Sequence, residues 1–324
     1  MMNTRVKDID FKSADHVIEE IRNMNVKGGS PFGRSAAWAF KLAIEQEDLN
    51  DFDTLKTRLE DVAKQMIGLK PTMATIHNSC DIVLSLLNKD KDKDKDKDLD
   101  ELKKQIVKVC ENIIEQSFVA VEKVADYGSN LIKEGDTVLM HSYSSTLMGI
   151  FKAARNKGVN FKLICTESRP LRESRNAVNV LTEIGVDVTF ISDASVFEFM
   201  KTADLIIMGA DTLSTDGSVA NKMGSAQIAC LARSCKVPVY FASELYKLDL
   251  RTQYGYNIQL ERRTPFELVC NEDFKDFEKV RVINQFFDIT PANDIKGIIT
   301  EFGVLQPAQM VLYWNKLIKN IMED

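Results

Sequence analysis

The chain has 324 residues, 44% of them apolar, which is long enough for about two domains and a sizeable core. Its formal net charge of −6 argues against a general nucleic-acid-binding surface, because phosphate contacts rely on clustered basic residues. Residues 1–16 lack an apolar signal segment, and no window approaches the ~18 apolar residues of a membrane span, so we expect a cytoplasmic protein that binds neither membrane nor nucleic acid directly.

The N-terminal part is predicted to be helical. Between residues 13 and 87, apolar side chains recur at helical spacing, and Gly68 and Pro71 punctuate the pattern. The alternating charges of residues 88–100 predict a solvated loop, with a docking tail as the alternative. A helical pattern from Leu102 to Ile132 then predicts a long helix that joins the two halves. We therefore place a helical N-terminal domain, carrying the charged loop 88–100, at residues 1–130.

From Lys133 onward the pattern changes to short apolar runs separated by helical segments. The predicted strands are residues 137–141, 161–166, 187–192, 204–210 and 237–242. Alternation of this kind predicts a parallel sheet covered by helices. The fold class is therefore α/β, with the helical domain followed by a Rossmann-like domain with a mainly parallel sheet at residues 131–324.

Polar residues follow most of these strands. Because the carboxyl ends of parallel strands meet at one edge of the sheet, these residues predict a polar pocket there. They include His141, Ser142, Ser144, Ser145, Glu167, Arg169, Asp211, Glu244 and Lys247.

The composition of this predicted pocket indicates a phosphorylated ligand. Cationic and neutral donors suited to phosphate come from Arg169, Lys222, Lys247, Ser144, Ser145 and the backbone around Gly217 and Gly224. Acceptors suited to sugar hydroxyls come from Glu167, Asp211, Asp216 and Asn221. We expect a sugar phosphate or a nucleoside monophosphate.

Each of these assignments has a structural alternative. Lys222 and Arg169 could be surface charges paired with acids. The serines could cap the next helix, and His141 could be a packed neutral histidine.

A second glycine-rich segment, residues 26–40, precedes a predicted helix. Lys27, Gly28, Gly29 and Arg34 could bind phosphate there, although ordinary loop geometry is the alternative.

The six cysteines contain no CxxC pair, so we expect no zinc site, no disulfide framework and no cofactor. We interpret them as reduced core residues, namely Cys80, Cys110, Cys165, Cys230, Cys235 and Cys270.

Several motifs together resemble one protein family. The central motif is GADTLSTDGSVANKMGS at residues 209–225. The others are NMNVKGGSPFGRSAAWA, KPTMATIHNS, LMHSYSS, CTESRP, ASELYK and FFDITPANDIKGIITEFGVLQP. They resemble the alpha, beta and delta subunits of translation initiation factor 2B, a family that includes ribose-1,5-bisphosphate isomerase and methylthioribose-1-phosphate isomerase.

The resemblance implies a helical domain on a Rossmann-like domain, a homodimer or higher homo-oligomer, and bound sugar phosphates or nucleotides. It leaves open complexes with other initiation factor 2B-type subunits.

The resemblance also implies two possible functions. Isomerases of the family use the aspartate of GAD, matched by Asp211, and a cysteine after the first strand, where this chain has Ser142. A serine hydroxyl ionises far less readily than a thiol. HSYS is similar to the HxYS of the alpha subunits, although those commonly carry GAE. We therefore expect a ligand-binding regulatory-subunit-like protein, with a sugar-phosphate isomerase that uses Asp211 and Ser142 as the alternative.

Overall fold

The computed structural model describes residues 8–26, 28–89 and 99–323. Lys27 and most of the predicted charged loop 88–100 lie outside these described residues. The chain divides into two compact units. The first contains residues up to Val119 with Tyr246–Asp249 and Leu312–Asp324, and the second contains Ala120–Leu245 and Leu250–Val311.

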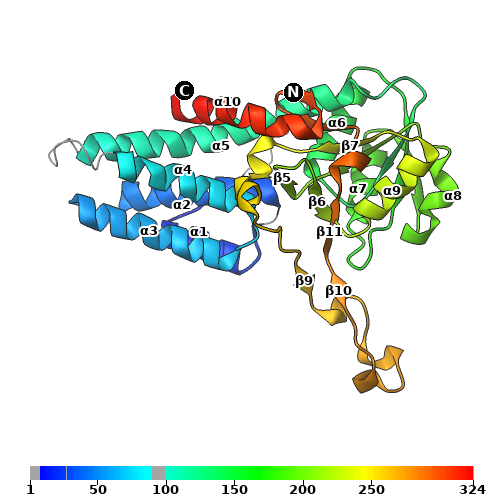
Figure 1. Ribbon diagram of the computed structural model, residues 1–324, viewed down its shortest axis with the longest axis horizontal. Coiled ribbons are helices and arrows are strands. Elements are labelled where there is room, and N and C mark those ends of the chain that lie inside the picture. Colours follow the sequence, from blue (N-terminus) through cyan, green and yellow to red (C-terminus); the bar gives the residue numbers. More distant parts are fainter. Residues whose placement is uncertain (1–7, 27, 90–98, 324) are drawn as a thin grey trace. The chain divides into compact units, whose positions relative to one another are not determined.

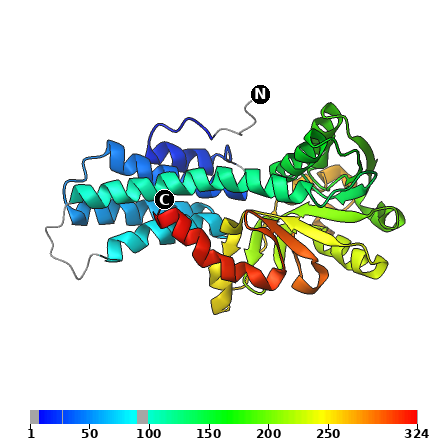
Figure 2. The ribbon, with the colours of Figure 1, turned by 90° about the horizontal axis from the view of Figure 1, so that it is seen from above.

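The first unit is helical. In Figures 1 and 2 its long helices lie side by side. The helices are α1 (Ala14–Arg22), α2 (Gly29–Gln46), α3 (Phe52–Leu69), α4 (Ala74–Lys89), the first part of α5 (Leu99–Ser129), and most of α10 (Met310–Glu323). Helix α2 packs against α1, α3 and α4. Its buried alanines, among them Ala36, Ala37 and Ala43, allow close approach. As predicted, a break at Gly68 to Pro71 separates two helices, because α3 ends at Leu69.

The second unit contains the mainly parallel sheet that the sequence predicts. In the described residues it has seven strands in the order β13-β12-β7-β4-β1-β2-β3, and only β13 is antiparallel to its neighbour. They are β1 (Thr137–Met140), β2 (Lys162–Thr166), β3 (Asp187–Ile191), β4 (Leu205–Gly209), β7 (Val239–Ala242), β12 (Gly297–Thr300) and β13 (Gly303–Leu305). All five predicted strands are present, whereas β12 and β13 were not predicted.

The strand order reverses at β1. From β1 the chain proceeds outward through β2 and β3, whereas β4, β7 and β12 extend the sheet on the other side. Open α/β sheets bind ligands at such a reversal, beyond the carboxyl ends of the strands. The fold therefore places the residues after β1 and β4 at the centre of this edge.

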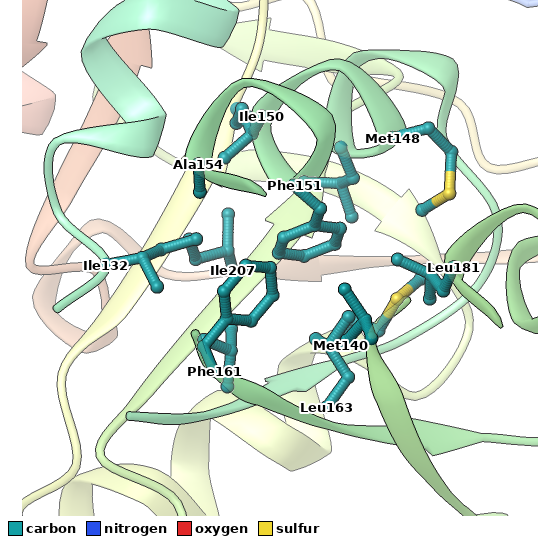
Figure 3. Packing of buried hydrophobic residues seen from close by; sticks show 14 of the residues in the cluster. Ile132, Met140, Met148, Ile150, Phe151, Ala154, Phe161, Leu163, Leu181 and Ile207 are labelled. Carbon is teal, nitrogen blue, oxygen red and sulfur yellow. The ribbon is translucent and has the colours of Figure 1, made fainter. Parts of the chain in front are cut away.

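The helices of the second unit cover the sheet and bury its apolar core. They are α6 (Ser145–Asn156), α7 (Ser174–Glu183), α8 (Val196–Met200) and α9 (Ser225–Cys235). Figure 3 shows Phe151, Phe161 and Ile207 packed together. The ring centroids of Phe151 and Phe161 lie 5.9 Å apart. This core anchors α6, whose N-terminus follows β1 directly.

A smaller antiparallel sheet carries the second half of the GAD motif. Strand β6 (Val219–Lys222) pairs with β5 (Thr212–Ser214) and with β11 (Phe287–Thr290). The hairpin between β5 and β6 turns at Asp216 and Gly217, where Asp216 Oδ1 accepts a hydrogen bond from Ser218 N. These two residues therefore form the turn of the hairpin. Short strands β9 (Arg262–Arg263) and β10 (Asn284–Gln285) also pair, and β8 (Leu248–Asp249) belongs to the first unit.

All six cysteines lie in the described part of the chain and are free. Cys80, Cys110 and Cys165 are buried, as predicted, and Cys235 is partly buried. The prediction is wrong for Cys230 and Cys270, which are exposed. Cys230 lies on α9 away from its buried residues, and Cys270 lies in an irregular segment, so local apolar spacing misled the interpretation. Among the described helices, none combines the length and the apolar character needed to cross a membrane.

Candidate functional site

His141 joins three segments at the carboxyl edge of the sheet. It follows β1 and is 2% exposed. Its Nδ1 lies 2.6 Å from Thr166 Oγ1 at the end of β2, and its Nε2 lies 2.9 Å from the carbonyl oxygen of Met223. Burial lowers the pKa of His141, which favours a neutral ring. Because a carbonyl only accepts, Nε2 carries the proton, and the geometry matches the packed-histidine alternative.

Gly224 allows the chain to pass beside this ring. Its φ of +108° suits glycine, and a Cβ atom there would lie 3.1 Å from His141 Nε2.

The loops after β1, β2 and β3 are tied together through backbone amides. Ser142 has φ +67°, and its N–H donates to Ser168 Oγ at 2.7 Å. The two carboxylate oxygens of Asp193 accept from Ser168 N and Arg169 N, each at 2.8 Å. These bonds hold the three strand ends in one arrangement, and Ser142 lies within it.

The GAD segment and the start of α6 are in close contact. Ser144 is the N-cap of α6, but its side chain makes no capping hydrogen bond. A Cβ atom on Gly209 would lie only 2.9 Å from Ser144 Cβ and 3.9 Å from Asn221 Oδ1. Asp211 is half-buried, and its N–H donates to the carbonyl of Ala220. The structure therefore brings Ser144, Asp211 and Asn221 into one neighbourhood, which Ser145 enters as the first residue of α6.

Lys222 is held inside this site by a residue that the sequence did not single out. Its side chain is 4% exposed, and its Nζ lies 2.6 Å from Glu173 Oε1. The same Nζ lies 3.7 Å from the centroid of the Phe286 ring. Glu173 precedes α7, 49 positions from Lys222, and no motif marked it.

Asp288 occupies the N-terminus of α9. Its carboxylate accepts hydrogen bonds from Gly224 N at 2.7 Å and Ala226 N at 3.2 Å. Burial raises the pKa of Asp288 to about 6, and these hydrogen bonds oppose that rise. The amide of Gly224 is therefore engaged by protein, which corrects its assignment to phosphate. Asp288 lies in the FFDITP motif, and this position was the sequence signal that could have identified it.

The remaining predicted residues of the second unit lie around this centre. Glu167 lies 3.6 Å from Arg172, and Arg169 Nη2 donates to the carbonyl of Leu268 at 3.3 Å. Glu244 follows β7 and is 1% exposed.

The other predicted residues belong to the first unit. Gly28 has φ +94°, and Gly29 is the first residue of α2. Arg34 is 4% exposed, pairs with Asp8 at 2.8 Å and donates to Ser117 Oγ. Arg34 thus contributes to packing within its own unit. Lys247 is 8% exposed, and Lys27 lies outside the described residues.

A doubly wound, mainly parallel sheet with polar groups at its reversal point defines a Rossmann-like α/β protein. The model of the initiation factor 2 subunit family matches residues 25–307, and the chain belongs to this family.

Relatives with two kinds of name are similar to this chain. A ribose 1,5-bisphosphate isomerase of Methanocaldococcus jannaschii is 33% identical over 290 residues, which cover 89% of this chain and 90% of the relative. A putative translation initiation factor eIF-2B subunit 2-like protein of Pyrococcus furiosus is 32% identical, over 90% of this chain and 95% of the relative. The crystal structure of the Pyrococcus horikoshii translation initiation factor eIF-2B matches with a TM-score of 0.73 and 27% identity, over 91% of this chain and 98% of that one.

Proposed function

We propose that this chain is a regulatory-subunit-like, cytoplasmic member of the family that binds a sugar phosphate or a nucleoside monophosphate at the carboxyl ends of β1, β2 and β4, and does not isomerise it. The observation that carries the proposal is Ser142, which stands where the resemblance places the cysteine of the family's isomerases. Its hydroxyl is too weak an acid to move protons between sugar carbons as a thiolate could.

No neighbouring thiol can replace that cysteine. Cys165 lies opposite Met140 in the β1–β2 register, close to Ser142 along the sheet. However, it is buried in the apolar core, and burial raises the pKa of its thiol to about 12. A thiol in that environment stays protonated near pH 7, which supports a binding role for the site.

In this proposal the ligand's phosphate binds hydrogen-bond donors at the start of α6. Ser144 and Ser145 begin α6, where helix amides and an uncommitted hydroxyl suit phosphate. Asp211 and Asn221 then suit the sugar hydroxyls. This arrangement needs no metal or cofactor.

A sugar-phosphate isomerase is the second candidate, because Asp211 matches the aspartate of the isomerases and a 33% identical relative bears that name. In this alternative Asp211 moves protons with Ser142, or with His141, in place of the cysteine. Both nitrogens of His141 are engaged, which weighs against that role.

The deciding experiment is phosphorus NMR with ribose 1,5-bisphosphate, with and without AMP, on the unmodified chain and on Ser142→Cys. We expect no turnover by the unmodified chain and measurable turnover by the variant. Ser145→Cys, which adds a thiol three positions away, is the matched control and should stay inactive. The isomerase would be established instead by two results together. The unmodified chain would turn over the sugar, and Asp211→Asn would abolish this turnover while calorimetry showed that its ligand affinity is retained.

We further propose that the chain forms a homodimer or a higher homo-oligomer, and that it can join other initiation factor 2B-type subunits. The family membership supports this, as do apolar side chains exposed on the second unit, among them Phe197, Phe266 and Ile283.

A further inference from the structure

The contact between Lys222 and Glu173 changes what the predicted phosphate site can bind. Lys222 Nζ lies 2.6 Å from Glu173 Oε1, so the nearest partner of this cation is already an anion. The pair is mostly removed from water, where charges interact strongly. A phosphate at Lys222 would therefore meet a carboxylate beside the ammonium.

A neighbouring cation, Arg263, does not add an unpaired positive charge beside Lys222 and Glu173. The guanidinium of Arg263 lies 4.5 Å from the Phe286 ring centroid, on the same ring that Lys222 contacts. Arg263 is in turn paired with Glu267 at 2.7 Å. Each cation at this aromatic ring is thus neutralised by its own glutamate.

Glu173 still has hydrogen-bonding capacity to offer. Among the described residues, its buried Oε2 has no hydrogen-bond partner. Leaving such an oxygen unsatisfied is unfavourable, so a donor that reaches it gains a strong, charge-assisted bond. The Glu173 side chain is 25% exposed, so a molecule bound at this edge of the sheet can reach the carboxylate and supply a donor.

The loop before Glu173 is well positioned to hold it. Ser168 and Arg172 both have positive φ, at 58° and 59°, and Asp193 binds the amides of Ser168 and Arg169. The carboxylate therefore belongs to a defined loop of the site.

We infer that Glu173 is a specificity-determining residue, which makes the Lys222 corner of the site a receptor for a ligand hydroxyl and weakens the binding of a phosphate there. The Glu173 carboxylate accepts a hydrogen bond from the hydroxyl, while Lys222 Nζ donates one to the hydroxyl oxygen. This inference rests on the proposed function, and it implies that the site prefers a sugar with one phosphate over the bisphosphate. The phosphate then lies away from Lys222, at the start of α6.

Calorimetry with ribose 5-phosphate and ribose 1,5-bisphosphate tests the inference, because the two differ only in a hydroxyl or a phosphate at carbon 1. We expect the unmodified chain to bind the monophosphate more tightly. In Glu173→Gln, the ratio of the two dissociation constants should shift toward the bisphosphate by about tenfold or more, since a buried negative charge is lost. Glu173→Ala should shift it in the same direction.

Glu183→Gln is the matched control, because it removes an exposed carboxylate from the same helix, α7, and should leave the ratio unchanged. If all variants bind both sugars with the same ratio of dissociation constants as the unmodified chain, the role of Glu173 is overturned and the proposed function is not. Failure of every variant to bind either sugar, with AMP still bound, would overturn this inference alone, whereas failure to bind AMP as well would overturn the proposed function.

Discussion

Several residues at the carboxyl edge of the sheet contribute through their backbone or through the lack of a side chain. Gly209 lets β4 end directly against Ser144, and Gly224 lets the backbone pass the His141 ring. Ser142 takes a left-handed conformation while its amide binds Ser168. The site therefore depends on the backbone at a few positions as much as on charged side chains.

Gly209→Ala tests this close approach. The added methyl group would lie 2.9 Å from Ser144 Cβ, so one of the two must move. We expect a loss of about 1–3 kcal/mol in the free energy of unfolding and weaker ligand binding.

Gly149→Ala on α6 is its control, because the new Cβ would meet only Ala125 Cβ at an ordinary 3.4 Å. It should stabilise the protein slightly through better helix propensity. Urea unfolding measures both variants, and equal stability of the two would contradict the steric argument.

At the scale of elements, hydrogen bonds between loops define the carboxyl edge of the sheet. Asp193 after β3 holds the loop after β2, and Asp288 on β11 holds the start of α9. Glu301 after β12 accepts a hydrogen bond from Leu245 N at 3.0 Å, which connects the ends of β12 and β7. Acidic side chains thus serve as acceptors for amides that no strand satisfies.

Glu301 also predicts a pH dependence of stability. Burial raises the pKa of Glu301 to about 7, and the hydrogen bond from Leu245 N opposes this rise. Nearby Glu244 adds to the rise and Lys123 opposes it. The folded state therefore binds this proton more tightly than the unfolded state, whose pKa is near 4.5. Protonated Glu301 therefore contributes fully to stability below pH 4.5, and this contribution is lost as the pH rises to about 7.

Glu301→Gln should remove this loss while keeping an acceptor for Leu245 N. Urea unfolding at pH 5 and pH 8 measures how far the free energy of unfolding falls between the two pH values. We expect this fall to be larger in the unmodified chain than in the variant, by up to about 3 kcal/mol. Equal declines in the two proteins would show that Glu301 is ionised in the folded state.

At the scale of the whole molecule, two compact units share one chain that passes between them several times. The second unit includes Ala120–Leu245 and Leu250–Val311, whereas Tyr246–Asp249 belongs to the first. Phe266 is 61% exposed and Phe197 is 54% exposed on the second unit. Exposed aromatic side chains of this size are typical of surfaces that bind other proteins.

We therefore expect light scattering in solution to give at least twice the chain mass of 36.6 kDa. Phe266→Ser should shift the equilibrium toward monomer, because Phe266 is the more exposed of these two aromatic side chains. A single species of 36.6 kDa at micromolar concentration would contradict the proposed homo-oligomer.

The sequence alone was sufficient for the fold class and for most of the main sheet. Continuous apolar runs bounded by polar residues identify buried parallel strands, so the runs at β1, β2, β3, β4 and β7 were all predicted. Strand β12, with the four residues Gly297–Thr300, follows a long irregular segment and lacked that contrast. The motifs around Asp211 and Asn221 were sufficient to recognise the family.

Only the tertiary structure decided how the polar groups are paired. Lys222 binds Glu173, 49 positions away, and Gly224 binds Asp288, 64 positions away. Periodicity and motif spacing report on local conformation and on which residues end a strand. They do not encode which distant carboxylate reaches a given cation or amide, because that depends on how the loops pack. The candidate residues that follow the strands could therefore be read from the sequence, whereas Glu173, Asp288 and the availability of the other residues to a ligand could not.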